Sequence, residues 1–118
     1  MQLGLVSGDL MLVSRLEGAA RKLGWTLVTA ATGAAAGAWD RNEIAAVVVD
    51  LRTVGAGIGA FAETWRAAGA APPLVACGPH VQEALLAAAR EAGCAAVVTR
   101  GQIDHDAEHI LATVTAGE

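Results

Sequence analysis

Residues 45–50 spell Ala-Ala-Val-Val-Val-Asp, an apolar run without polar alternation that ends on a carboxylate. A strand with one face in water alternates apolar and polar side chains, whereas a strand covered on both faces can be apolar throughout. Branched valine side chains also suit a pleated strand. We therefore predict that residues 45–49 form a strand inside a parallel sheet, with helices packed on both of its faces.

Four more apolar runs fit short strands, at 3–6, 26–30, 74–77 and 95–99. Apolar residues at helical spacing predict helices over 12–23, 58–65, 81–92 and 107–114. We predict Asp104 as the N-cap of the last helix, and a brief or irregular segment over 32–41, which carries two glycines. This strict alternation predicts a doubly wound, flavodoxin-like α/β fold with five parallel strands in the order 2-1-3-4-5.

Composition limits the class of protein. The chain has 118 residues, 54% of them hydrophobic and 17% charged, which predicts one well-packed domain over 1–118. The net charge is −4 and no basic stripe is present, so we expect neither nucleic-acid nor membrane binding. The amino terminus lacks the basic region of a signal peptide, and Cys77 and Cys94 are the only cysteines. We therefore predict a cytoplasmic protein with reduced thiols.

Function in open parallel sheets usually lies at the carboxyl ends of the strands. Three stretches around those ends are AAVVVDLRTVG at 45–55, PPLVACGPH at 72–80 and AREAGCAAVVTRG at 89–101. They resemble the third strand, the fourth strand with its turn, and the fifth-strand region of response-regulator receiver (CheY-like) domains. The resemblance extends over essentially the whole chain.

The resemblance implies a module of two-component signal transduction, with Asp50 at the position of the phosphate-accepting aspartate. It places Arg100 where the family has a lysine, and Gly78 where the family has a hydroxyl residue that binds the phosphoryl group. The family's acidic residues after the first strand hold magnesium together with the acceptor. In this chain those positions correspond to Ser7 and Gly8.

These departures predict a degenerate pocket formed by Ser7, Gly8, Asp9, Gly78 and Arg100. Phosphoryl transfer to a carboxylate depends on a cation that spreads the developing charge, and magnesium usually takes carboxylates among its ligands. We therefore expect no cofactor, weak magnesium binding at most, and no catalytic residue. We expect Asp50 and Arg100 to form a constitutive ion pair instead.

Several of these residues also have a simpler structural interpretation. Asp50 can be a turn aspartate that accepts backbone N–H groups, and Asp9 can be the N-cap of the first helix. His105 and His109 have a spacing that can bind metal, but a solvated helix face is the simpler interpretation because no further ligands accompany them. The glycine-rich stretch 55–59 lacks the ending of a nucleotide P-loop and is better explained as loop slack.

Receivers commonly transmit signals through the face formed by their fourth helix, fifth strand and fifth helix. The resemblance implies that a protein partner, or a second copy of the chain, binds the same face here. The side chains that we predict on this face are Gln82, Leu86, Arg90, His105 and His109. We expect Leu86 to be exposed, because the core stripe of its helix is predicted to run through Val81, Leu85 and Ala88.

The favoured function is a non-enzymatic, receiver-like signalling module, a pseudo-receiver that acts mainly by phosphorylation-independent protein binding. One alternative is a phosphorylatable receiver with Asp50 as the acceptor. A second alternative is a small-ligand-binding or enzymatic module on a flavodoxin-like scaffold, because such folds host many functions. The sequence has no nucleophile–base pair, cofactor fingerprint or set of four metal ligands that favours this second alternative.

Overall fold

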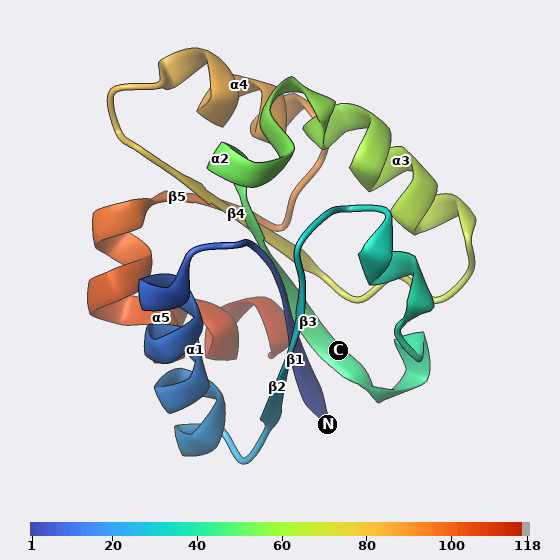
Figure 1. Ribbon diagram of the computed structural model, residues 1–118, viewed down its shortest axis with the longest axis vertical. Helices are drawn as coiled ribbons and strands as arrows, with labels where there is room; N and C mark the ends of the chain where they lie inside the picture. The colour runs from blue at the N-terminus through green and yellow to red at the C-terminus, as the bar shows by residue number, and fades with distance from the viewer. Residues whose placement is uncertain (117–118) are drawn as a thin grey trace.

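The computed structural model describes residues 1–116 and contains one parallel sheet in the order β2-β1-β3-β4-β5 (Figure 1). The strands are β1 (Gln2–Val6), β2 (Thr26–Ala30), β3 (Ile44–Asp50), β4 (Leu74–Gly78) and β5 (Ala96–Thr99). All of the neighbouring strands pair in parallel. The predicted five strands and their order are therefore confirmed.

Helices cover both faces of the sheet (Figure 1). One face carries α1 (Leu10–Lys22) and α5 (Arg100–Thr115), and the other carries α2 (Leu51–Val54), α3 (Ile58–Ala67) and α4 (Glu83–Glu91). Three 3-10 turns complete the second face: η1 (Ala35–Ala38), η2 (Arg41–Glu43) and η3 (Gly55–Gly57). The irregular segment predicted over 32–41 is confirmed, since η1 and the first residue of η2 are its only regular structure. None of the helices within residues 1–116 is long and apolar enough to cross a membrane.

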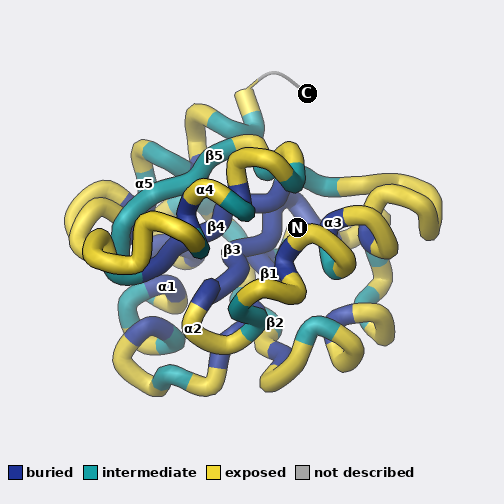
Figure 2. The backbone as a smooth tube through the Cα atoms, turned by 90° about the horizontal axis from the view of Figure 1, so that it is seen from above, coloured by how far each residue is buried: buried dark blue, intermediate teal, exposed yellow. Residues whose placement is uncertain are grey.

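β3 contributes side chains to both halves of the core. Every residue of β3 is buried, and successive side chains point to opposite faces of the sheet. Val47 and Val49 pack with α3 and α4, whereas Ala46 and Val48 pack with α1 and α5. Figure 2 shows β3 and β4 as the buried centre of the molecule, with the exposed helix surfaces around them. The burial predicted for residues 45–49 on both faces is therefore confirmed.

α5 begins directly after β5, so the predicted N-cap role of Asp104 is wrong. Thr99 is the N-cap: its hydroxyl accepts from the Gln102 backbone N–H, and the Gln102 side chain accepts from the Thr99 N–H. These reciprocal bonds form a capping box. At Asp106 the backbone leaves helical geometry (φ −125°, ψ 26°), which kinks α5.

The phase of α4 also differs from the sequence-based prediction. The helix begins at Glu83, so Val81 lies in the preceding loop and is 73% exposed. Leu86 faces the sheet and is only 3% exposed. The predictions of an exposed Leu86 and a core Val81 are both wrong. Neighbouring positions on a helix are separated by about 100°. Because Val81 is not part of the helix, the buried face of α4 is formed by Leu86 and Ala89, one position further along the chain than the predicted Leu85 and Ala88.

Candidate functional site

Asp50 and Ser7 lie side by side at the carboxyl edge of the sheet. Asp50 is the last residue of β3, and Ser7 directly follows β1, its neighbouring strand in the sheet. The pairing of Val6 with Val49 sets this register. Both polar residues are only 4% exposed. The strand order therefore brings a hydroxyl and a carboxylate together in a site that is almost closed to water.

The Asp50 carboxylate binds neutral donors. Ser7 Oγ donates a 2.7 Å hydrogen bond to Asp50 Oδ2, and the Arg52 backbone N–H donates to Oδ1 at 3.0 Å. Thr53 Oγ1 lies 3.5 Å from Oδ2. Asp50 is also the N-cap of α2, so the turn-aspartate interpretation is confirmed. Both carboxylate oxygens are therefore hydrogen-bonded within the protein.

Arg100 binds a different carboxylate from the one predicted. Its Nη1 lies 2.7 Å from Asp9 Oδ2, and its Nε lies 3.3 Å from Asp104 Oδ1. Asp50 forms no salt bridge among residues 1–116, so the predicted Asp50–Arg100 ion pair is wrong. The physical reason is the early start of α5, which places Arg100 in the first turn beside the β1–α1 loop. There its side chain reaches Asp9.

Asp9 joins the arginine to the serine. Its Oδ1 accepts from the backbone N–H groups of Met11 and Leu12, which confirms Asp9 as the N-cap of α1. Its own N–H donates to Ser7 Oγ at 3.0 Å. The hydrogen bond from Arg100 and the capping N–H groups lower the pKa of the Asp9 carboxyl. Asp9 is thus kept ionised by an arginine on one side and a helix terminus on the other.

The Ser7 contact is the feature that sequence reasoning missed. We identified Ser7 only as a missing acid, although a serine hydroxyl can both donate and accept. The available signal was the strand order, because neighbouring parallel strands place the residues at their ends next to each other. A serine after β1 and an aspartate at the end of β3 were therefore candidates for a direct hydrogen bond.

Gly78 and Gly8 provide no side-chain ligand. Gly78 is buried at the end of β4, and a Cβ built there would lie 3.3 Å from Leu51 Cβ and Cδ1. Leu51 therefore fills the space beside this backbone. Gly8 is exposed, with open space where a Cβ would lie. Cys77, which pairs with Asp50 across β3 and β4, is fully buried, and this burial raises the pKa of its thiol to about 12.

The residues at this edge do not fit a magnesium ion. Magnesium requires several oxygen ligands in near-octahedral geometry. Asp50 binds Ser7 and a backbone N–H, and Asp9 binds Arg100 and caps α1. Nowhere in residues 1–116 do three or more His, Cys, Asp or Glu side chains gather in a way that could hold a metal ion.

The predicted partner face is only partly available to a partner. Four of its five side chains are exposed: Gln82 before α4, Arg90 on α4, and His105 and His109 on α5. The fifth, Leu86, lies in the core. β5 lies at one edge of the sheet between these helices (Figure 1). This face therefore presents polar and charged side chains without the apolar residue that we expected at its centre.

Comparison with known proteins identifies the fold. No family model and no curated protein matches the chain. Among solved structures, a response regulator receiver protein from Pseudoalteromonas atlantica matches with a TM-score of 0.82 and 16% identity, covering 99% of this chain and 98% of that chain. A response regulator from Thermotoga maritima also gives 0.82 and 16%, over 98% of this chain and 97% of that chain. The chain has the receiver fold.

A third receiver-fold structure bears directly on the site. The receiver domain of a sensor histidine kinase from Pseudomonas aeruginosa matches with a TM-score of 0.79 and 17% identity, over 98% of this chain and 97% of that chain. That protein has a magnesium ion coordinated in its active site cleft. At sequence identities this low, the structural similarity establishes the receiver fold alone. Function must therefore be argued from the residues of the site.

Proposed function

We propose that the chain is a pseudo-receiver, a non-enzymatic signalling module that binds a protein partner in the cytoplasm without being phosphorylated. The observation that carries this proposal is the 2.7 Å hydrogen bond from Ser7 to Asp50 inside a site where both residues are 4% exposed. It occupies the carboxylate that a phosphorylatable receiver would present to a phosphoryl donor and a metal. The likeness to response regulator receivers supplies the link to signalling.

A continuous set of polar contacts supports a fixed pocket. Asp104 and Asp9 hold Arg100, the Asp9 N–H donates to Ser7, and Ser7 donates to Asp50. These contacts connect the first turns of α5, α1 and α2. Phosphorylation of Asp50 would have to break the Ser7 bond, and the nearby carboxylate of Asp9, which could contribute to a magnesium site, is already bound to Arg100. The pocket therefore favours one constitutive conformation.

The decisive experiment adds magnesium and beryllofluoride, which mimics a phosphoryl group on aspartate, to the protein. Amide chemical shifts around residues 7–9 and 50–53 should not change at millimolar magnesium. The matched positive control is a Ser7→Asp, Gly8→Asp double variant, which restores two carboxylates and should bind magnesium more tightly. Saturable shifts at those residues in the unmodified protein would instead support the alternative of a phosphorylatable receiver.

We further propose that the partner, or a second copy of the chain, binds the exposed part of the α4–β5–α5 face. Arg90 and the two histidines His105 and His109 provide polar recognition there. Arg90→Glu should weaken association in sedimentation velocity and in pull-downs from the host, with an unchanged circular dichroism spectrum. Arg21→Glu, at the exposed end of α1, is the matched charge reversal on another helix. If association weakened equally in both variants, or in neither of them, the interface would have to lie elsewhere.

A further inference from the structure

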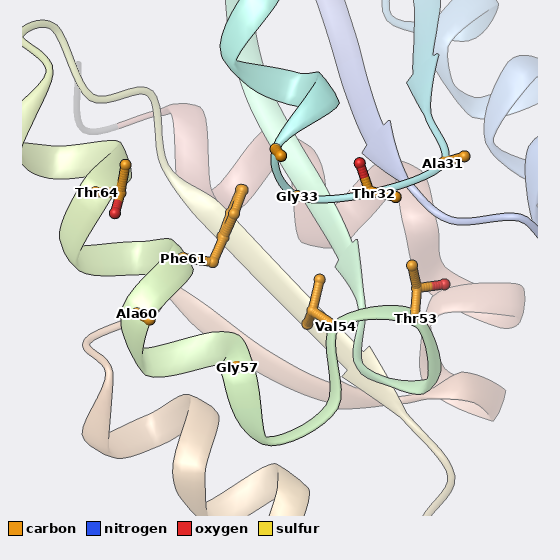
Figure 3. Close-up of a pocket in the computed structure, with 10 residues that line it drawn as sticks. Ala31, Thr32, Gly33, Thr53, Val54, Gly57, Ala60, Phe61 and Thr64 are labelled. Atoms are coloured by element: carbon orange, nitrogen blue, oxygen red, sulfur yellow. The ribbon is translucent and has the colours of Figure 1, made fainter.

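A separate pocket of about 430 Å³, open to solvent, lies near the Asp50 site, between the loop after β2, the turn from α2 to η3, and α3 (Figure 3). We refer to it below as the cavity. Its origin lies in the connection from β2 to β3. That connection forms only the short turns η1 and η2, and its first residues, Ala31 to Ala34, line the cavity. The volume lies within the range of small-molecule sites, about 300–1,000 Å³.

The lining is mostly apolar with a few hydroxyl groups. Phe61 and Val54 project from the α2–α3 side towards the loop that holds Thr32 and Gly33 (Figure 3). The hydroxyl-bearing residues are Thr32, Thr53 and Thr64. None of the ten described residues around the cavity is charged. Ligand sites commonly combine an apolar wall with a few polar groups in this way.

The aromatic wall of the cavity is held in place by its neighbours. Phe61 stacks on Trp65 with ring centroids 6.0 Å apart and an interplanar angle of 18°. Trp65, which supports Phe61, is itself covered by Arg41, whose guanidinium lies 3.7 Å from the centroid of a Trp65 ring. A Cβ at Gly33 would lie 2.8 Å from Phe61 Cδ1, so this glycine lets the ring lie against the loop. The wall is therefore formed before any ligand binds.

The hydroxyl groups have directional preferences that limit the ligand. Thr32 Oγ1 already accepts from the Ala35 N–H at 3.1 Å, which leaves its own proton free to donate. Thr53 Oγ1 lies 3.5 Å from the Asp50 carboxylate, so negative charge lies behind this wall. An anion would meet that carboxylate without a cationic side chain to balance it. A neutral ligand with a hydrogen-bond acceptor fits these conditions best.

We propose that this cavity binds a small, neutral, planar aromatic molecule that carries a carbonyl-type acceptor. Its ring lies against Phe61 and Val54, and its acceptor faces Thr32. Aromatic rings pair favourably with a fixed aromatic wall, and the hydroxyl group orients the ligand. This proposal does not rest on the proposed pseudo-receiver function, because the ligand contacts neither Asp50 nor the α4–β5–α5 face.

The test uses benzamide as the probe and benzoate as its charged counterpart, with binding followed by amide chemical shifts. Benzamide should cause saturable shifts confined to residues 31–34, 53–57 and 60–64, and benzoate should bind several-fold more weakly. Ala60→Leu on α3 keeps a good helix former and fills the cavity. It should therefore weaken the binding of benzamide at least about tenfold. Ala67→Leu lies on the same helix but outside the lining, so its affinity for benzamide should stay within about twofold of that of the unmodified protein.

Three results would overturn the proposal: shifts that do not saturate, shifts that appear outside those residues, or equal affinity in the Ala60→Leu and Ala67→Leu variants. Circular dichroism on each variant separates loss of the site from loss of the fold. Residue 53 belongs to both sets of reporters, but the beryllofluoride experiment uses a different ligand and is also read at residues 7–9 and 50–52, outside the benzamide set. The two proposals can therefore fail separately.

Discussion

At the scale of the residue, Asp50 is a buried carboxylate whose hydrogen bonds come from a hydroxyl and a backbone N–H. Burying a charge without a counter-ion is costly, and hydrogen bonds to the charged form offset part of that cost. Ser7 is therefore a stabilising partner of Asp50. The sequence indicated that both residues lie at the same edge of the sheet. It could not indicate whether Arg100 would reach Asp50 or Asp9, because that depends on where α5 begins.

Ser7→Ala should destabilise the protein by about 1–3 kcal/mol, because it leaves one buried oxygen of Asp50 with only the long contact to Thr53. Asp50→Asn should cost less, since the amide oxygen can accept from the Arg52 N–H, the amide NH2 can donate to Ser7 Oγ, and the buried charge is removed. Urea unfolding at neutral pH measures both changes. Ser14→Ala, on the exposed side of α1, is the control. A larger loss in Asp50→Asn than in Ser7→Ala would contradict the view that Ser7 supports a charged Asp50.

At the scale of the element, the strands were more predictable than the helix boundaries. Each strand corresponds to a short apolar run in the sequence, and the ends of the run leave few alternative positions for the strand. α4 was ambiguous because Leu85 and Leu86 are adjacent in an alanine-rich helix, and either could define the apolar face. The start of α5 was visible in principle, since Thr99 and Gln102 have the spacing of a capping box. We instead predicted the N-cap at Asp104, further along the chain.

The corrected phase of α4 makes a direct prediction. Leu86→Ala should cost about 2–5 kcal/mol, because it removes a fully packed side chain from the core beneath α4. Leu85→Ala, one residue earlier, should cost clearly less, since Leu85 is only partly buried. Urea or thermal unfolding compares the two variants under the same conditions. Equal costs would mean that α4 is rotated about its axis so that both leucines contribute alike to the core.

α1 and α5 are joined by an ion pair whose strength depends on pH. Arg15 Nη1 and Nη2 contact the two carboxylate oxygens of Glu108 at 3.1 and 3.2 Å. This hydrogen bonding lowers the pKa of Glu108 from 4.5 to about 2. A carboxyl whose pKa is lower in the folded state contributes stability above its unfolded pKa and loses it as pH falls.

The stability advantage of the unmodified protein over Glu108→Gln should therefore be complete above pH 4.5 and should disappear as the pH falls towards about 2. Urea unfolding at a series of pH values measures this difference. Glu17→Gln, on an exposed position of α1, controls for the general effect of removing an acid. A constant difference across the same pH range would rule out the ion pair as its source.

At the scale of the whole molecule, β3 connects the two halves of the core. Trp25 packs against the half under α1 and α5, whereas Trp39 and Trp65 belong to the half under α3 and α4. Since β3 supplies buried residues to both halves, neither half can lose its packing without exposing that strand. We therefore expect one cooperative unfolding unit, as predicted for a single domain.

Two variants separate the fluorescence of the two halves. Trp25→Phe keeps the tryptophans on the α3–α4 side, and a Trp39→Phe, Trp65→Phe double variant keeps only Trp25. Within each variant, urea unfolding curves from tryptophan fluorescence and from circular dichroism should coincide. Curves that separate in either variant would show that one half of the core unfolds before the other.

The direct junction between β5 and α5 also limits how this protein can be engineered. Thr99 ends the strand and caps the helix, and Arg100 already reaches across to Asp9. A reporter peptide inserted between Thr99 and Arg100 would separate the cap from its helix and move the arginine away from its partner. Before α4, the N-cap residue Gln82 makes no side-chain cap bond, and the residues ahead of it, His80 and Val81, are exposed to solvent. A biosensor built on this scaffold should therefore accept its insert at 80–81 and fail to fold with the same insert at 99–100.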